Sequence, residues 1–371
     1  MKRIAFYGSS LLSSYWNGAA TYYRGIIRAL AAQGWDVTFH EPDAWDRQAH
    51  RDMDPPGWCR VNVWDSTPEG LRAAADRADG ADVVVVASGI GYEDDALRRR
   101  VLDRASPGAL RVWWDVDAPA TLAAMRADPG HPLRRDLPRF DIVLTYGGGD
   151  PVVRAYRALG ARDCMPIYNA LDPDTHFPVA PDARFDADLA FLGNRLPDRD
   201  ARVREFLFRP ARALPGRRFG LGGSGWSDVA LPPNLHPLEH VGTDAHNAFN
   251  ATPLAVLNIA RDSMAEIGFS PATRVFEAAG AGACLITDAW EGIDLFLAPG
   301  DEVLVARDGQ DVADLLSGLS REAARRIGRA ARSRILSEHT YTHRAREAGD
   351  LFSRMLTRKP AQAHPQTETL L

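Results

Sequence analysis

Residues 270–290 read SPATRVFEAAGAGACLITDAW and carry Arg274 and Glu277 one helical turn apart. The pattern indicates a short helix, a glycine-rich turn and a buried strand, with Ser270 as the N-cap and Pro271 at the first helical position. The start of such a helix has unpaired N–H groups and partial positive charge, which suit a phosphate. A carboxylate at its end could accept hydrogen bonds from ribose hydroxyls. Alternatively, Arg274 and Glu277 form an ion pair on a solvated face, and the spacing alone slightly favours this alternative.

A second candidate stretch is FLGNRLPDRD, residues 191–200. An apolar strand ends in a turn made by Gly193 and Asn194, and Arg195 and Arg199 follow. Guanidinium groups on the loop after the first strand of a domain suit a diphosphate. The alternative is a surface loop in which the arginines pair with the neighbouring aspartates, and the sequence does not decide between the two.

The stretch FGLGGSG, residues 219–225, formally contains G-x-G-x-x-G. The dinucleotide-binding fingerprint requires a helix after these glycines, but the following residues are rich in proline and cannot form one. We therefore reject the fingerprint. A flexible loop whose backbone approaches a ligand remains open.

In VWWDVDAPATLAAM, residues 112–125, Asp115 and Asp117 resemble a D-x-D metal motif at the end of a strand. Pro119 then opens a helix, so these aspartates could simply cap it. Alternatively, the acidic pair holds a hydroxyl group of an acceptor or acts as a general base.

Two more loops follow predicted strands. One contains Asn17 and Gly18, and the other, TYGGGDP, contains three glycines that include Gly148. Ligands bind beyond the carboxyl ends of strands in open α/β sheets, so both loops could line a cleft. For the glycine loop, flexibility alone is an equally good explanation.

No metal site is predicted. His236, His240 and His246 are near each other in sequence, but no matching series of cysteine or acidic ligands accompanies them. The three cysteines are scattered and show neither metal spacing nor a disulfide framework, which suits a reducing compartment.

Composition excludes several classes of protein. The net charge is −5 and no long basic run occurs, which argues against nucleic acid and anionic membranes as partners. The start, MKRIAFYG, lacks the apolar core of a signal peptide, and no apolar run approaches the ~18 residues of a membrane span. We therefore expect a cytoplasmic protein. The oligomeric state stays open.

Strand-like and helical patterns alternate twice along the chain. Predicted strands include RIAFYG, WDVTFH, ADVVVVAS, LRVWWDV and FDIVLTY, and the series restarts with ADLAFLGN, PLAVLNIA and ACLITDA. Strands that are apolar nearly throughout are typical of parallel sheets buried on both faces. The pattern predicts two Rossmann-like, doubly wound α/β domains that face a cleft.

The domain boundaries follow from these patterns and from a proline-rich stretch. They are an N-terminal domain at 1–168, a linker at 169–181, a C-terminal domain at 182–340, a C-terminal helix at 341–357 that packs toward the N-terminal domain, and a disordered tail at 358–371.

Taken together, these stretches resemble one family over about residues 1–355, the CgeB-like glycosyltransferases, which belong with the family 4 enzymes of GT-B type. The segments that carry the resemblance are DLAFLGN…R, LNIARDSM, SPATRVFEAAGAGACLITD, GIDLFLAPGDEVLVA and SEHTYTHR in the C-terminal half, and GSSLLSSYWNGAATYYRGIIRAL, DVDAPATLA and TYGGGDPVVRAYRALGAR in the N-terminal half.

The resemblance implies a GT-B fold and a retaining transfer of sugar from a UDP-, GDP- or dTDP-sugar, with the nucleotide in the C-terminal domain and the acceptor mainly in the N-terminal one. Such enzymes generally need no bound metal, so we expect no cofactor besides the donor, and an acceptor that is a glycan, small molecule or protein.

Glu277 matches the family glutamate that holds the ribose. We expect Asp117 to contact the acceptor and Arg199 to stabilise the leaving diphosphate. The full set expected at the donor is Gly193, Asn194, Arg195, Arg199, Ser270, Thr273, Arg274 and Glu277, and the set expected at the acceptor is Asn17, Gly18, Asp115, Asp117 and Gly148.

One position departs from the family pattern. Many family 4 enzymes carry two glutamates separated by seven residues, and Phe269 stands in the first place here. This departure motivates one alternative, a protein of this fold that binds without turnover. A second alternative, a GT-B epimerase that interconverts nucleotide sugars, also stays open.

Overall fold

The computed structural model describes residues 1–359, and the chain divides into two compact units. Unit 1 comprises Met1–Tyr146, Val152–Ile167 and the segment that begins at Arg344, and unit 2 comprises Gly147–Pro151 and Tyr168–His343. The chain therefore passes between the units four times, and neither unit is one continuous stretch of sequence.

The predicted boundaries can be set against these units. The proposed linker, 169–181, lies within unit 2. The proposed C-terminal helix corresponds to α14 (Tyr341–Arg358), which belongs to unit 1 from Arg344 onward. The described part of the proposed tail is ordered, since α14 extends to Arg358 and the ammonium group of Lys359 lies 2.6 Å from a carboxylate oxygen of Asp141. The rest of that tail, 360–371, lies outside the described residues.

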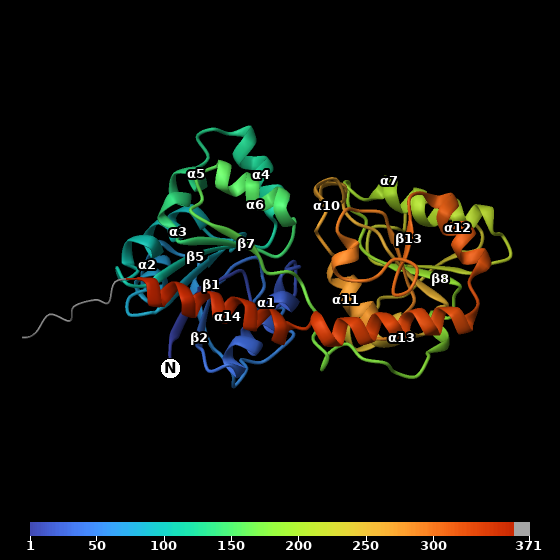
Figure 1. Cartoon of the computed structure of the whole chain (residues 1–371), viewed down its shortest axis with the longest axis horizontal. Helices are drawn as coiled ribbons and strands as arrows, with labels where there is room; N and C mark the ends of the chain where they lie inside the picture. Colours follow the sequence, from blue (N-terminus) through green and yellow to red (C-terminus); the bar gives the residue numbers. More distant parts are fainter. Residues whose placement is uncertain (360–371) are drawn as a thin grey trace, which may run out of the picture. The chain divides into compact units, whose positions relative to one another are not determined.

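Unit 1 is built on a seven-stranded sheet in the order β3-β2-β1-β4-β5-β6-β7, and every pairing is parallel (Figure 1). Its strands are β1 (Arg3–Tyr7), β2 (Asp36–Asp43), β3 (Arg60–Asp65), β4 (Val83–Ala87), β5 (Leu110–Asp115), β6 (Ile142–Thr145) and β7 (Cys164–Pro166). All five residues of β4 are buried, which explains the uninterrupted VVVVA run: a central strand of a parallel sheet is covered on both faces.

Helices follow most of these strands, as expected of a doubly wound sheet. They are α1 (Ala20–Ala32), α2 (Pro68–Asp76), α3 (Asp94–Arg104), α4 (Ala118–Ala127), α5 (Pro132–Asp136), a 3₁₀ turn (Leu137–Arg139), α6 (Gly149–Ala158) and α14. From α14, Phe352 is fully buried and packs edge-on against Trp35 and Trp114, with ring centroids 5.8 and 6.4 Å away. The C-terminal helix is therefore part of the core of unit 1.

Unit 2 repeats the architecture with six parallel strands in the order β10-β9-β8-β11-β12-β13. The strands are β8 (Leu189–Leu192), β9 (Phe219–Gly222), β10 (Leu235–Pro237), β11 (Ala255–Asn258), β12 (Leu285–Asp288) and β13 (Leu304–Ala306). Leu189 and Phe191 contribute to one core cluster and Ala190 to another, because successive side chains of a strand point to opposite faces. The sheet is thus buried on both sides.

The helices of unit 2 contribute buried side chains to both core clusters, beside those of the strands. They are α7 (Asp200–Val203), which continues through a π-helical turn (Arg204–Phe208) into α8 (Arg209–Ala213), α9 (His246–Ala251), α10 (Asp262–Ile267), α11 (Thr273–Gly280), α12 (Gly309–Gly318) and α13 (Arg321–Glu338), with 3₁₀ turns at Ala183–Phe185, Thr243–Ala245 and Ile293–Leu295.

The prediction of two doubly wound parallel sheets is confirmed. One local prediction was wrong. The N-cap of α11 is Ala272, and the Ser270 hydroxyl instead donates a hydrogen bond to the Gly268 carbonyl at 2.9 Å. In the stretch 219–225, for which the sequence leaves a flexible loop open, Phe219–Gly222 forms strand β9. Among the described residues, no helix combines the length and apolarity needed to cross a membrane.

Candidate functional site

The order of the strands locates the part of unit 2 where a ligand is expected. β8 lies between β9 and β11, and the chain order reverses on its two sides. In open α/β sheets, ligands bind beyond the carboxyl ends of strands at such a reversal. The loop after β8, residues 193–199, therefore occupies the favoured place.

This loop is held in shape by its neighbour after β9. The Gly193 N–H donates to the Gly222 carbonyl at 2.9 Å, and the Asn194 side-chain oxygen accepts from the Ser224 N–H at 2.9 Å. The indole N–H of Trp226 donates to the Gly193 carbonyl at 2.8 Å. Gly193 and Asn194 thus serve the local structure, and the Asn194 oxygen is already bonded.

Two arginines share one aromatic ring beside this loop. The guanidinium carbons of Arg199 and Arg274 lie 5.6 and 5.2 Å from the ring centroid of Phe191, which is the third residue of β8. Arg199 donates to the Asn194 carbonyl at 2.6 Å, and Arg274 donates to the Leu192 carbonyl. Within residues 1–359, neither arginine has a carboxylate at salt-bridge distance. The pair therefore brings two positive charges to one ring without a direct ion pair in this part of the chain.

The surroundings of these two cations make an anion favourable there. Burial lowers the pKa of Arg274 to about 10, with nearby Glu277 acting to raise it and Arg199 to lower it further. Burial also lowers the pKa of Arg199, opposed by Asp198 and aided by Arg261. Both remain protonated at neutral pH, and a bound anion would offset their loss of hydration.

Arg195 differs from its neighbours. Its Nε lies 2.6 Å from Asp200, and its Nη1 lies 3.2 Å from Asp228. The surface-pairing alternative from the sequence thus describes Arg195, and Arg199 is the arginine of this loop that such pairing leaves available.

The start of α11 lies in the same unit, and Thr273 is its first residue. Its N-cap, Ala272, has no side chain that could satisfy the first N–H groups of the helix. The Val275 N–H donates to the Ala272 carbonyl at 3.0 Å, so the N–H groups of Thr273 and Arg274 are the ones at this end that a polar ligand could accept from. Ser270 is buried and is turned toward Gly268, so its expected contact with a donor is not supported by its position.

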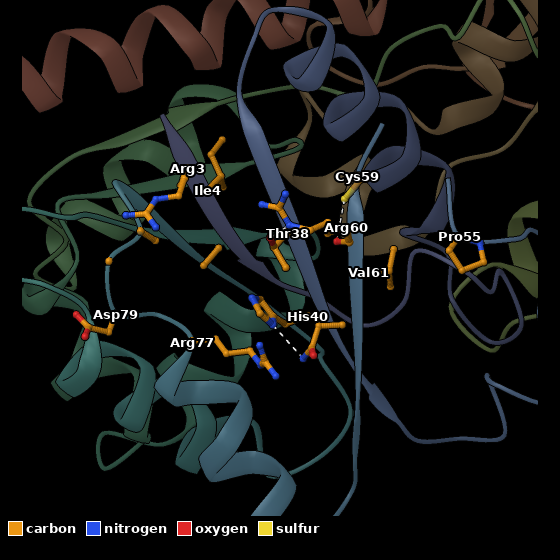
Figure 2. A pocket seen from close by; sticks show the side chains of 14 residues that line it. Arg3, Ile4, Thr38, His40, Pro55, Cys59, Arg60, Val61, Arg77 and Asp79 are labelled. Carbon is orange, nitrogen blue, oxygen red and sulfur yellow. Dashed lines mark hydrogen bonds between the residues drawn. The ribbon is translucent and has the colours of Figure 1, made fainter. Parts of the chain in front are cut away.

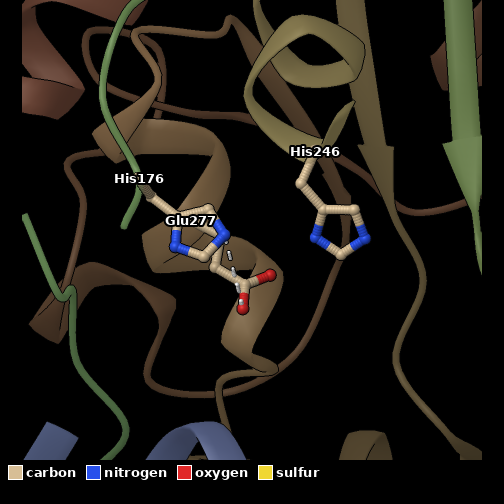
Figure 3. Close-up of side chains that lie close together, drawn as sticks. All are labelled: His176, His246 and Glu277. Atoms are coloured by element: carbon tan, nitrogen blue, oxygen red, sulfur yellow. Dashed lines mark ion pairs between the residues drawn. The ribbon is translucent and has the colours of Figure 1, made fainter. Parts of the chain in front are cut away.

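Glu277, one turn after Arg274, lies beside two histidines that the sequence did not connect with it. The nearest atoms of His176 and Glu277, Nε2 and Oε1, are 4.0 Å apart, and His246 completes the group (Figure 3). One ligand atom from each residue lies within 4.8 Å of the others. Such a group could hold a metal ion, which the sequence analysis did not predict. Arg274 and Glu277 form no ion pair within salt-bridge distance in the described chain.

The glycine loop around Gly148 packs on the segment before α11. The Gly148 N–H donates to the Phe269 carbonyl at 2.7 Å, and Phe269 itself has the left-handed value φ +48°. A Cβ added to Gly149 or Gly292 would lie within 2.6 and 2.3 Å of the Phe269 side chain. The glycines thus make room for Phe269, which stands where many family 4 enzymes carry a glutamate.

In unit 1, the structure separates Asp115 from Asp117. Asp115 is fully buried, and its carboxylate accepts hydrogen bonds from the Tyr156 hydroxyl, from the Thr121 hydroxyl at 3.1 Å and from the Asp117 N–H at 2.9 Å. Burial raises its pKa. Asp115 is therefore an interior structural group, contrary to its expected contact with an acceptor. Asp117 is the N-cap residue of α4, is partly exposed and makes no side-chain capping bond.

Asn17 also has a structural position. Its amide nitrogen donates to the Ser10 and Ser13 carbonyls at 2.8 and 3.0 Å, and its oxygen accepts from the Ser9 hydroxyl at 2.9 Å. The side chain fixes the loop after β1 and has little capacity left for a ligand. Gly18 is exposed, and a Cβ there would meet nothing within 4 Å.

A pocket of about 530 Å³ lies elsewhere in unit 1, beside the amino-terminal parts of β1, β2 and β3 (Figure 2). Arg3, His40, Arg60 and Arg77 are among its lining residues. Burial lowers the pKa of His40 to about 3, so this imidazole is neutral, and it contacts the Asn62 amide at 3.2 Å. The pocket lies away from the carboxyl ends of the strands, where this fold places its ligands.

Comparison with known proteins gives a family model for part of the chain. Residues 199–350 match a model described as "Glycosyl transferase-like", a range that begins at Arg199 and includes Arg274 and Glu277. No curated protein matches the chain by sequence.

Solved structures match over almost the whole chain. Sucrose-phosphate synthase from Thermosynechococcus elongatus has a TM-score of 0.70 at 14% identity, covering 96% of this chain and 100% of that one. HepE from Anabaena, in complex with UDP-glucose, has a TM-score of 0.65 at 12% identity, covering 95% and 100%. An α-glucosyltransferase in complex with UDP-glucose and DNA has a TM-score of 0.69 at 11% identity, covering 95% and 99%. The fold is therefore GT-B, as predicted, and the CgeB-like subfamily stays a prediction.

Proposed function

We propose that this protein is a glycosyltransferase that moves a sugar from a nucleotide-sugar donor to an acceptor hydroxyl. The observation that carries the proposal is the pair Arg199 and Arg274, two cations on one Phe191 ring that have no carboxylate at salt-bridge distance among residues 1–359. This pair lies at the point of a GT-B fold where a ligand is expected, and two cations there suit an anionic ligand. The diphosphate of a nucleotide sugar has the required charge.

In this proposal, unit 2 binds the donor. Arg199 and Arg274 contact the diphosphate together with the first N–H groups of α11 and the Thr273 hydroxyl, and Glu277 accepts hydrogen bonds from the ribose. Gly193 and Asn194 shape the loop. Arg195 is left out because Asp200 and Asp228 already neutralise it.

In the transfer, the bond between the anomeric carbon and the donor phosphate breaks, and a bond from that carbon to the acceptor oxygen forms. The acceptor proton leaves with the diphosphate or to solvent. Negative charge develops on the leaving diphosphate, and one positioned donor of this kind lowers such a barrier by about 3 kcal/mol. Attack from the face of the departing group retains the anomeric configuration. We propose that no metal ion takes part and that Asp117 orients the acceptor.

The acceptor is proposed only as a hydroxyl compound. The net charge of −5 disfavours nucleic acid, although three of the matching α-glucosyltransferase structures were solved with DNA. UDP is the first nucleotide to test, because the HepE and α-glucosyltransferase complexes named above contain UDP-glucose.

The test is thermal unfolding with UDP, GDP, dTDP and ADP and their sugar conjugates, on the wild type and on Arg274→Met and Glu277→Ala. A nucleotide at 100 times its Kd stabilises the protein by about 2.7 kcal/mol. We expect one nucleotide class to stabilise the wild type and to lose its effect in both variants. Arg307→Met is the matched control, because Arg307 is exposed and paired with Asp311.

Product analysis then separates the alternatives. Free nucleoside diphosphate together with a new glycoside of retained configuration, formed in the presence of EDTA, supports the proposal. Interconversion of two nucleotide sugars would identify an epimerase instead. The absence of a shift with every nucleotide at millimolar concentration would contradict the donor site.

A further inference from the structure

Three segments of unit 2 meet at His176, His246 and Glu277. His176 lies in the stretch before β8, His246 is the first residue of α9 and Glu277 lies on α11. The rings of His176 and His246 have centroids 6.3 Å apart, and Figure 3 shows both beside the Glu277 carboxylate. The side chains of His176 and Glu277 are only 11% and 19% exposed. The group is thus largely enclosed but still open to solvent.

The backbone that carries His176 is tied to the residue next to His246. The Asn247 amide nitrogen donates to the Thr175 carbonyl at 2.9 Å, and its oxygen accepts from the Phe177 N–H at 3.2 Å. One side chain therefore bonds to both neighbours of His176. In addition, the His176 N–H donates to the Asp172 carbonyl at 3.0 Å. The two histidines are held near each other before any ligand binds.

The contacts of His176 leave one ring nitrogen next to Glu277. The Thr175 hydroxyl lies 2.9 Å from His176 Nδ1 and 3.1 Å from the Asp172 carbonyl oxygen. The other ring nitrogen, Nε2, lies 4.0 Å from a carboxylate oxygen of Glu277. In the tautomer that carries its proton on Nδ1, Nε2 offers a lone pair to a cation that this carboxylate also contacts.

The other charged groups nearby leave room for a cation. Arg274 donates to the Leu192 carbonyl, and Asp244 adds a negative charge from the turn before α9. Burial lowers the pKa of His246, with Glu277 and Asp244 opposing and with His176 and Arg274 aiding the shift.

We propose that His176, His246 and Glu277 form a binding site for a divalent transition-metal ion, Zn²⁺. Two imidazole nitrogens and one carboxylate oxygen are a ligand set that zinc uses when its fourth position is open to water. Ligand atoms about 2.0 Å from a tetrahedral zinc ion are about 3.3 Å apart, so side-chain rotations must bring these atoms together from within 4.8 Å. The hydrogen bond from His176 Nδ1 to Thr175 is the outer contact that typically orients a ligating histidine.

The site would also regulate the proposed transferase. This consequence rests on the proposed function, in which Glu277 binds the ribose of the donor. One carboxylate cannot ligate zinc and accept hydrogen bonds from ribose in the same geometry, so Zn²⁺ and nucleotide should compete.

The test starts from metal-free, full-length protein titrated with Zn²⁺ by calorimetry and with Co²⁺ by visible absorption. We expect one equivalent of each to bind, with cobalt giving the intense band of a four-coordinate ion. His176→Ala, His246→Ala and Glu277→Gln should each abolish this binding. His240→Ala is the matched control, because His240 is exposed and outside the group. Thermal unfolding without metal shows that each variant is folded.

A further variant tests the positioning of the ligands. Asn247→Ala retains all three ligands but removes the two hydrogen bonds that flank His176, so zinc affinity should fall by about tenfold. No stoichiometric binding by the wild type, or binding that the three ligand variants leave unchanged, would overturn the proposal. A group that is bridged by a proton alone gives no cobalt band and also overturns it.

Failure of the metal site and failure of the proposed function give different results. The double variant His176→Ala/His246→Ala should lose zinc binding but keep stabilisation by nucleotide, and zinc should weaken UDP binding only in the wild type. Zinc binding without any response to nucleotides would refute the proposed function and leave the metal site standing. Nucleotide binding without zinc binding would refute the metal site and leave the proposed function standing.

Discussion

Each unit buries arginine side chains against the loop that follows its first strand, β1 in unit 1 and β8 in unit 2, but these arginines differ in their contacts. In unit 1, Arg47 is 7% exposed and donates to the Ser9, Ile90 and Trp16 carbonyls at 3.5, 3.1 and 3.4 Å. Burial lowers the pKa of Arg47, and nearby Tyr23, Glu41 and Asp94 act to raise it. This arginine therefore ties the surrounding loops together.

In unit 2, Arg199 and Arg274 each donate to one carbonyl. Burial lowers the pKa of Arg274, which Glu277 acts to raise and Arg199 to lower. The surfaces next to the arginines differ as well. Unit 1 exposes Trp16 and Trp45, which are 81% and 68% exposed and both have positive φ. Arg47 donates to three carbonyls, whereas Arg199 and Arg274 each donate to one. The comparison teaches that burial of an arginine does not identify a ligand site, whereas the number of hydrogen bonds that it already makes within the protein helps to do so.

The largest effect should come from Arg274→Met. Methionine retains much of the volume over Phe191 but removes the charge. Loss of one preorganised donor to a developing anion lowers kcat/KM by about 100-fold. Steady-state kinetics with the donor identified by thermal shift will measure this. A variant as active as Arg307→Met would show that Arg274 does not contact the donor.

Arg47→Met should instead affect stability. It leaves three carbonyls in unit 1 without their donor, at a cost of about 2 kcal/mol in the free energy of unfolding, with nucleotide affinity unchanged. Urea unfolding and nucleotide titration check the two parts. Arg60→Met is the control, because Arg60 is mostly exposed and its pair with Asp36 should be worth less than about 1 kcal/mol. Loss of nucleotide affinity in Arg47→Met would contradict the assignment of a purely structural role to Arg47.

The third effect depends on pH. His40 is 2% exposed and burial lowers its pKa to about 3, so the folded protein binds no proton there while the unfolded chain does below its ordinary pKa of 6.5. Its contribution to stability is complete above pH 6.5 and decreases as the pH falls toward 3. At pH 5.5 the loss is about 1.4 kcal/mol.

The variant His40→Gln cannot take up that proton. Between pH 7.5 and 5.5, its free energy of unfolding should therefore fall by about 1.4 kcal/mol less than that of the wild type. Urea unfolding at the two pH values measures this difference. Equal pH dependence of the two proteins would show that His40 is protonated in the folded state.

The smallest effect on stability should come from Trp16→Ser. The side chain is 81% exposed, so the free energy of unfolding should change by less than about 0.5 kcal/mol. If the acceptor stacks on Trp16, sugar transfer should fall by roughly fivefold while hydrolysis of the donor stays constant. Leu295→Ser, at a 48% exposed site in unit 2, is the control. An equal loss of sugar transfer and donor hydrolysis would show that Trp16 does not bind the acceptor.

The architecture could be predicted because its signals are local. A strand such as β4 is apolar throughout, and this alone indicates a parallel sheet covered on both faces. The start of α11 was predicted wrongly, because Ser270 has the right side chain for a cap. Only the turn at Gly268, with φ +72°, directs its hydroxyl away from the helix.

The candidate site was less predictable because its contacts are distant in sequence. The spacing of Arg274 and Glu277 favoured an ion pair between them. In the structure, Arg274 instead lies over the ring of Phe191 and Glu277 lies next to His176, and both of these residues are on other segments. The spacing of Asp115 and Asp117 indicated an acidic pair. In the structure, the carboxylate of Asp115 instead accepts a hydrogen bond from the hydroxyl of Tyr156, on α6. Spacing along a chain cannot show such partners.

The division of the chain also has a consequence for biosynthesis. Residues 168–343 of unit 2 emerge from the ribosome before the segment that completes unit 1. Until then, the first unit lacks Phe352, which packs on Trp35 and Trp114, and it exposes apolar surface that the finished protein covers. The order of translation therefore allows unit 2 to fold first, whereas unit 1 can complete its core only after α14 has been synthesised.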